Sequence, residues 1–180
     1  ISVNKTDGEQ EIMVATKDGF AVRFKETDAR AMGRTTRGVK AVELRKGDCV
    51  VSAMVIDENK SVLAITEGGY GKRTDVEEYR LQSRGGKGLK NYHIDKYGQV
   101  AAISAIEEDE DIILISQDGI IIRIPANEIS TFARPSKGVR VMKVTEGERL
   151  ATMTTTEHID AEETESEAEE ATADTAEENQ

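Results

Sequence analysis

The sequence predicts an all-β protein with a β-propeller-like fold built from about three full repeats of fifty residues. The chain aligns with itself, without a gap, when it is shifted by fifty positions. Asp-Gly pairs lie between short apolar runs, which is typical of β-hairpins. A period of about 40–50 residues made of short strands is typical of propeller blades, because each unit buries its apolar face on its neighbours.

The repeat is clearest in glycines and cations that fall at matching positions in all three units. Each unit has a hairpin glycine, a strand arginine and a run of three cations around a second glycine. Chance rarely holds so many positions in register, so we interpret each unit as one blade. The aligned sets are Gly19, Gly69 and Gly119; Arg23, Arg73 and Arg123; Arg34, Arg84 and Arg134; Arg37, Lys87 and Lys137; Gly38, Gly88 and Gly138; and Lys40, Lys90 and Arg140.

The second unit illustrates the expected elements of an antiparallel four-stranded blade. Val62 to Ile65 is a short buried strand, and Tyr70 to Thr74 returns after a glycine turn. A polar connection over residues 75–81 has room for a helical turn and leads into a basic loop. The third and fourth strands are expected at Leu89–Ile94 and Val100–Ile106, with sister fourth strands at Val50–Ile56 and at Leu150 to about Thr154.

The repeat divides the chain into five parts. Residues 11–60, 61–110 and 111–153 are each expected to form one blade. Residues 1–10 align with the fourth strands, so the chain is expected to open in the last strand of a truncated preceding blade. Residues 154–180 hold 11 acidic residues, no Lys or Arg and no aromatic residue. Such a segment buries too little apolar surface to offset chain entropy, so it is expected to be a disordered acidic tail.

Charge is distributed unevenly along the chain. The net charge of −11 comes from the tail, because the remaining residues balance 24 acids against 24 Lys and Arg. Gly33–Lys40, Ser83–Lys90 and Ala133–Arg140 each carry three cations and no acid. A basic rim on a neutral body is the electrostatic footprint for a polyanion. The tail is then either a solubilising appendage or a tethered competitor for that rim.

The loop Gln82–Gly88, with the sequence Gln-Ser-Arg-Gly-Gly-Lys-Gly, is the first candidate for phosphate binding. Its glycines allow close approach, its N–H groups can face an anion, and its two cations add charge. A plain solvated turn is the alternative. Three further arginines, Arg23, Arg73 and Arg123, lie in strands. For them a structural role, such as pairing with a nearby acid, is an alternative to DNA contact. The expected DNA-binding residues are Gln82, Arg84, Gly85, Gly86, Lys87, Gly88 and Lys90, continued by Arg34, Arg37, Lys40, Arg134, Lys137 and Arg140, with Lys72 and Arg73 as further contacts.

No catalytic or metal-binding constellation is visible. His93, His158 and Cys49 do not have zinc-ligand spacing, and no phosphate-binding P-loop is present. No helix is expected to read bases, so binding should be sequence-tolerant and salt-dependent. No apolar run approaches the ~20 residues of a membrane helix, and a single cysteine fits a reducing cytoplasm.

Several motifs together carry a family resemblance. Gln82–Gly88 resembles the gyrase A box, and Gly69–Thr74 followed by Glu78-Tyr79 resembles the segment before that box. Gly119–Arg123 and Ser136–Val139 resemble the next repeat. Residues 1–153 are therefore similar to the C-terminal domain of the A subunit of bacterial DNA gyrase, which commonly ends in an acidic tail.

The resemblance implies a six-bladed β-pinwheel that wraps duplex DNA around its rim, so that strand passage introduces negative supercoils. Gln82, Arg84, Gly85, Gly86, Lys87 and Gly88 match the box, whereas Ser83 departs from the basic residue usual there. The family's box lies in the first blade, so this copy is expected in about the fifth. No tyrosine follows an arginine, so the family's DNA-cleaving tyrosine has no counterpart. This part should need no cofactor, because ATP and magnesium would act elsewhere in the enzyme.

The implied partners are double-stranded DNA and the rest of an A2B2 gyrase, in the bacterial cytoplasm and on the chromosome. Two alternatives stay open. The chain could be the C-terminal domain of the topoisomerase IV A subunit, which has the same pinwheel but a lost or degraded box. It could also be a propeller scaffold for protein partners, which would predict apolar or mixed loops instead of basic ones.

Overall fold

The computed structural model describes residues 2–94 and 97–158. This part of the chain contains short strands and three single-turn 3-10 helices, η1 (Glu26–Asp28), η2 (Val76–Glu78) and η3 (Ala126–Glu128). No helix found there is long and apolar enough to cross a membrane. The strands are β1 (Glu11–Thr16), β2 (Phe20–Lys25), β3 (Val50–Ile56), β4 (Ser61–Thr66), β5 (Tyr70–Asp75), β6 (Leu89–Lys90), β7 (Val100–Ile106), β8 (Glu110–Ser116), β9 (Ile121–Pro125), β10 (Val139–Arg140) and β11 (Leu150–Glu157).

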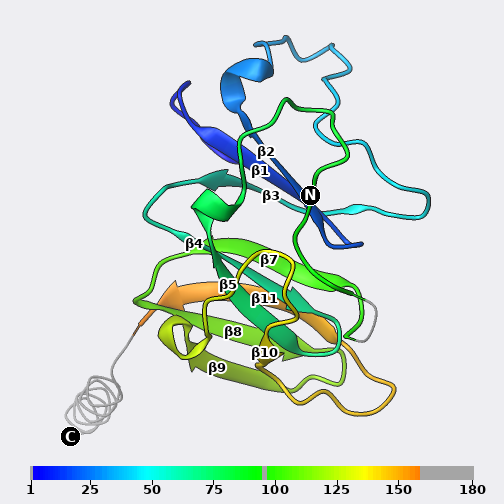
Figure 1. Ribbon diagram of the computed structural model, residues 1–180, viewed down its shortest axis with the longest axis vertical. Coiled ribbons are helices and arrows are strands. Elements are labelled where there is room, and N and C mark those ends of the chain that lie inside the picture. Colours follow the sequence, from blue (N-terminus) through cyan, green and yellow to red (C-terminus); the bar gives the residue numbers. More distant parts are fainter. Residues whose placement is uncertain (1, 95–96, 159–180) are drawn as a thin grey trace, which may run out of the picture.

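Three antiparallel sheets follow one another along the long axis of the molecule (Figure 1). Their strand orders are β3-β1-β2-β6, β10-β5-β4-β7 and β11-β8-β9. The expected all-β fold with repeated antiparallel blades is confirmed. The helical turn expected in the connection 75–81 is η2, and η1 and η3 lie at the matching places in the other units.

A hairpin forms the middle of both four-stranded sheets, and in the three-stranded sheet it supplies the central strand β8 and the edge strand β9. The turn glycines Gly19, Gly69 and Gly119 have φ angles of 79°, 77° and 84°, a region that residues with a Cβ rarely adopt. The side chains of β4 are buried at every position from 62 to 66, instead of alternating between buried and exposed, because both faces of the sheet are covered. The hairpin of β4 and β5 therefore forms the buried centre of its blade.

The outer strand of each four-stranded sheet comes from the following repeat. β6 pairs with β2, so that Lys90 lies opposite Phe20, and β10 pairs with β5 in the same way. The predicted third strand at Leu89–Ile94 was too long. The N–H groups of Asn91 and Tyr92 both donate to the Gly19 carbonyl, which ends the ladder.

Two other expectations at the ends of the chain need correction. Residues 2–10 are irregular instead of forming the expected last strand of a preceding blade. The strands at the matching positions, β3, β7 and β11, each pair with a hairpin that comes earlier in the chain. The described residues contain no hairpin before residues 2–10, so this segment has no strand to pair with. The expected tail begins later than residue 154, because Thr154–Glu157 continue β11 against β8, and threonine favours strands. The disorder expected for residues 159–180 lies outside the described residues.

Two clusters of the hydrophobic core lie between sheets and draw on two repeats each, and a third cluster lies within the first repeat. One cluster joins Met13 of the first repeat to Val62, Tyr79 and Tyr92 of the second. A second cluster joins Leu63 to Ile112 and Leu114 of the third repeat. The sheets are therefore held to one another by apolar burial as well as by the exchanged strands.

The strands β3, β7 and β11 form the inner side of the assembly. β7 packs against both of the others. A cavity of about 280 Å³ is lined by small side chains of these three strands, such as Ser52, Ala102 and Thr154. Because β6 and β10 lie at the far end of their sheets from β3 and β7, they occupy the outer edge.

We expect Gly88→Ala to destabilise the fold much more than Gly86→Ala. Gly88 has a φ of 74°, and a Cβ there would lie 2.8 Å from the carbonyl oxygen of Ala21 on β2. Gly86 lies in the same loop, and its nearest obstacle is 3.7 Å away. Urea unfolding should show a loss of about 2 kcal/mol or more for Gly88→Ala and less than about 0.5 kcal/mol for the control. Equal losses would contradict the close approach of Gly88 to β2.

Candidate nucleic-acid interface

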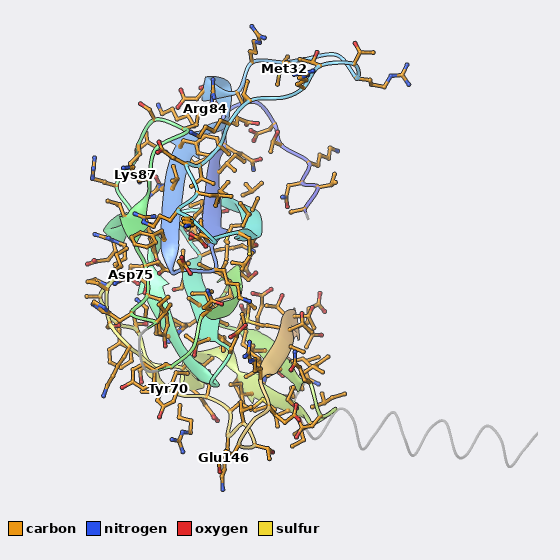
Figure 2. All side chains as sticks on the ribbon, turned by 90° about the vertical axis from the view of Figure 1, so that its right-hand side faces the viewer. Met32, Tyr70, Asp75, Arg84, Lys87 and Glu146 are labelled. Atoms are coloured by element: carbon orange, nitrogen blue, oxygen red, sulfur yellow. The ribbon has the colours of Figure 1, made fainter. Side chains whose placement is uncertain are left out.

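Two of the three basic loops lie at the outer edges of sheets, and each of the two lies against the sheet of the preceding repeat. Ser83–Lys90 belongs to the second repeat but lies against the first sheet, because it leads into β6. Figure 2 shows Arg84 and Lys87 beside the strands of that sheet. Ala133–Arg140 lies against the second sheet in the same way.

Arg84 joins two repeats through its guanidinium group. Its Nε donates to the carbonyl oxygen of Asp28 at 2.8 Å, and its Nη1 donates to that of Lys40 at 2.9 Å. Both acceptors belong to the first repeat, 56 and 44 residues earlier. The planar guanidinium fork suits two fixed acceptors, which the ammonium group of lysine does not match as well.

Arg134 repeats this arrangement fifty residues later. Its Nε donates to Glu78 O at 2.9 Å and its Nη1 to Lys90 O at 2.8 Å. We call Arg84 and Arg134 the bridging arginines. Their guanidinium groups hold the loops in place, so their charge reaches the surface only in part.

The glycines and Gln82 of the loop Gln82–Gly88 also make backbone contacts with the first repeat. The N–H of Gly85 donates to Ala41 O at 2.6 Å, and Gly86 O accepts from the N–H of Glu43 at 2.8 Å. The N–H of Gln82 donates to Arg23 O at 2.8 Å. The loop N–H groups of Gln82 and Gly85 are therefore occupied within the protein and do not form an open anion cradle.

Exposed cations project from these anchored loops. Lys87 is exposed, and its carbonyl accepts from Arg45 Nη1 at 2.9 Å. Lys137 is likewise exposed, with its Nζ 6.0 Å from the ring centre of Tyr97. Half-buried Lys90 and exposed Arg140 occupy β6 and β10. In the first repeat Arg34, Arg37 and Lys40 are exposed, and Lys40 lies 3.8 Å from Glu43.

Aromatic rings lie beside some of these cations. The rings of Tyr70 and Tyr97 are 4.3 Å apart, centre to centre. Arg140 stands over Tyr70 at 5.4 Å and donates to its hydroxyl at 2.9 Å. Arg45 stands over Phe20 at 3.2 Å. Such contacts hold a cation at a fixed place on the surface while leaving it charged.

Lys72 and Arg73 do not fit the surface role expected for them. Lys72 is fully buried, and its Nζ donates to the carbonyls of Ala133, at 3.1 Å, and Arg134. Arg73 is 7% exposed and bonds Ile129 O at 2.7 Å and Glu108 Oε1 at 3.0 Å. The next repeat covers both side chains, so neither can reach DNA in this structure. The structural alternative for the strand arginines holds for Arg73, and also for Arg23 and Arg123, which pair with Glu11 and Asp111.

The sequence analysis missed two further surface cations. Arg30 and Arg80 are exposed, and neither makes a hydrogen bond or ion pair within the described residues. They are separated by one repeat, so the same shift of fifty residues could have found them. No cluster of three or more His, Cys, Asp or Glu suited to a metal ion occurs in the described part of the chain.

The family model of the DNA gyrase C-terminal domain, a beta-propeller, matches residues 10–57, 60–107 and 110–157. The chain belongs to this family. The three matched segments begin fifty residues apart, which agrees with the repeat seen in the sequence.

Curated relatives are similar to the chain in sequence. The A subunit of DNA gyrase from Escherichia coli (strain K12) is 49% identical over 55 residues, which are 31% of this chain and 6% of that protein. The A subunit from Haloquadratum walsbyi is 38% identical over 60 residues, or 33% of this chain and 7% of that protein. The chain therefore corresponds to a small part of these relatives.

Two solved domains share the fold over most of the chain. The C-terminal domain of DNA topoisomerase IV superposes with a TM-score of 0.82 at 25% identity, covering 94% of this chain and 54% of that one. The DNA gyrase A C-terminal domain superposes with a TM-score of 0.77 at 28% identity, covering 83% and 52%. The gyrase relationship is the better supported of the two, because the family model and the curated relatives are those of gyrase A.

Arg84→Ala should lower the free energy of unfolding by about 2 kcal/mol, because two charge-assisted hydrogen bonds are lost and two carbonyls lose a partner. Lys87→Ala removes the same charge three residues away, from an exposed side chain, and should change stability by less than about 0.5 kcal/mol. Denaturant unfolding of both variants provides the comparison. Similar losses in the two variants would mean that the bridge formed by Arg84 is not structural.

Lys72 should make stability depend on pH in the alkaline range. Burial, followed by the nearby charge of Arg134, lowers the pKa of Lys72 from 10.5 to about 7. Between pH 7 and 10 the unfolded chain then binds one more proton than the folded chain, so stability rises with pH by at most about 1.4 kcal/mol per unit.

The matching variant is Lys72→Met, which keeps the length of the side chain and cannot titrate. Urea unfolding from pH 6.5 to 10 should show a steeper rise in stability for the wild type than for the variant. Parallel curves would show that Lys72 keeps its proton in the folded protein.

Proposed function

We propose that this chain is a DNA-binding and DNA-wrapping part of a gyrase A subunit. The observation that carries the proposal is the repetition of exposed loop cations at the outer edges of successive sheets, in a chain of the gyrase C-terminal domain family. A duplex that follows these edges would meet Lys87 on the first sheet and Lys137 on the second, one repeat apart.

The binding we propose is to the phosphate backbone. Exposed cations on loops can neutralise phosphates, and the described residues hold only strands and single-turn 3-10 helices, so they offer no recognition helix to read bases. Affinity should then be tolerant of sequence and fall steeply with salt. The bridging arginines would position the loops, and the lysines would carry most of the contact with DNA.

The wider role belongs to the same proposal. The whole protein would act in an ATP-dependent A2B2 gyrase that introduces negative supercoils in the bacterial cytoplasm, and its ATP and magnesium sites would lie in other parts. This chain would contribute no catalytic residue. Topoisomerase IV is the second candidate, because its C-terminal domain gives the higher TM-score of the two solved relatives.

The test is duplex binding by fluorescence anisotropy over a salt series. Lys87→Ala and Lys137→Ala should each reduce the slope of log Kd against log salt by about 0.9, the effect of one phosphate contact. Lys5→Ala is the matched control, since Lys5 is exposed but lies near β3 and β7, on the inner side. Equal slopes for all four proteins would argue against a phosphate track on the outer edge.

Wrapping needs a separate measurement. Relaxed plasmid closed by a nicking-closing enzyme in the presence of this protein should acquire a shifted linking number, and the shift should shrink with Lys87→Ala. Supercoiling of relaxed plasmid by the whole protein, supplied with ATP and its partner subunit, would favour gyrase over topoisomerase IV. Binding without any change in linking number would support DNA binding by this chain and contradict the proposed wrapping.

A further inference from the structure

Two tyrosine rings are in contact at the outer edge of the second sheet, which has all four of its strands. Tyr70 begins β5 and lies opposite Arg140 of the exchanged strand β10. Its ring lies 4.3 Å from that of Tyr97, centre to centre, with an angle of 47° between the two planes. Both side chains are half-buried, and Figure 2 shows Tyr70 on the same side of the molecule as Lys87.

The other two tyrosines have a structural role that Tyr97 does not share. Tyr79 and Tyr92 are 1% and 0% exposed and belong to a cluster of the hydrophobic core. Their hydroxyls are hydrogen-bonded within the protein. The Tyr97 hydroxyl makes no hydrogen bond to the described residues, and its ring contacts Tyr70 outside the core clusters. Core packing therefore does not account for Tyr97.

Tyr97 also departs from the repeat. The turn before the fourth strand has a glycine at Gly47 and at Gly147, fifty residues before and after Tyr97. In the second repeat this glycine is moved by one position to Gly98, whose φ of 79° is close to the 83° and 89° of the other two. The second repeat thus keeps the turn and adds an aromatic ring beside it.

Cations flank the two rings. Arg140 lies over Tyr70 at 5.4 Å, and the Nζ of Lys137 is 6.0 Å from the ring centre of Tyr97. Glu67, in the adjacent turn, is already paired with two other cations. Aromatic rings in a positively charged surface bind nucleic acid by stacking on the face of a base, while the cations hold its phosphates.

The first sheet lacks this arrangement. Phe20 occupies the position of Tyr70, but Arg45 lies over its ring at only 3.2 Å and also donates to the carbonyl of Lys87. The position of Tyr97 is held there by Gly47, so no second ring is present. The pair of rings is therefore a property of the second sheet and not of the repeat as such.

We propose that the Tyr70–Tyr97 pair binds an unstacked base of DNA that follows the outer edge, so that the duplex is kinked at the second sheet. This inference rests on the proposed DNA-binding function and adds the place and the chemical form of one contact. Smooth bending of duplex DNA is costly, and flexible steps such as TA unstack more easily than others. Stacking of the displaced base on Tyr97 offsets part of the cost of unstacking. The site thus selects deformable DNA without reading base edges.

Fluorescence anisotropy with this chain compares a fully paired duplex with the same duplex carrying a short bulge of unpaired bases at its centre. The wild type should bind the bulged duplex about tenfold more tightly, the effect of one base stacked on an aromatic ring. Tyr97→Leu should lose this preference and Tyr97→Phe should keep it, because both variants lack the hydroxyl and only the second keeps the ring. Equal affinities of the wild type for the two DNAs, or equal preferences in the two variants, would overturn the proposal.

Lys87→Ala separates this inference from the proposed function. Because Lys87 lies on the first sheet, its loss should weaken the binding of both DNAs alike and leave their affinity ratio unchanged. Failure of the wild type to bind either DNA would contradict the proposed function and this inference together. Tight, salt-dependent binding of both DNAs with equal affinity would contradict the stacking site alone.

The fluorescence of 2-aminopurine placed in the bulge reports stacking directly, since stacking quenches this base. At saturating protein, its emission should be lower with the wild type and with Tyr97→Phe than with Tyr97→Leu. Equal emission in the three complexes would show that the base does not lie on the Tyr97 ring and would overturn the proposal.

Discussion

The fold depends on the exchange of one strand and one guanidinium group between successive repeats. A two-residue strand contributes little on its own, but Arg84 and Arg134 add two carbonyl contacts each, and Gly88 and Gly138 allow the backbones to meet. Arg23 and Arg73 act in the opposite direction, because Arg23 donates to two carbonyls of the repeat that follows it and Arg73 donates to one. Every joint between two sheets is therefore made from both sides, with an apolar cluster beneath it.

The same joint determines where positive charge can appear. A loop fixed at one arginine and one glycine presents Lys87 as an exposed cation on the first sheet and Lys137 on the second. Lys72 shows the other outcome. Its strand lies under the exchanged loop, so its amine is buried against the carbonyls of Ala133 and Arg134. Cations that look alike in the sequence are thus divided between structural and surface roles by one layer of covering backbone.

The repeat could be predicted from the sequence because its signals are local. Turn glycines such as Gly19, apolar strands such as β4 and the alignment of cations all lie within one unit. The exchange could not be predicted, since self-alignment gives matching positions but not the unit with which a strand pairs. Arg84 has a structural role because its guanidinium group binds two carbonyl acceptors that lie 56 and 44 residues earlier in the chain, which its own repeat does not reveal. The burial of Lys72 likewise comes from residues of the next repeat. The self-alignment could have identified Arg30 and Arg80, because they lie fifty residues apart.

The exchanged strand also has a consequence for the order in which the protein can fold as it leaves the ribosome. The hairpin of β1 and β2 can pair with β3 once residue 56 has emerged, but the outer edge of β2 stays bare until β6 has been made. At about 5–20 residues per second this interval lasts a few seconds. During that time the nascent sheet can pair with a neighbouring nascent chain on the same messenger RNA. Translation speed between residues 56 and 90 thus becomes a determinant of correct assembly.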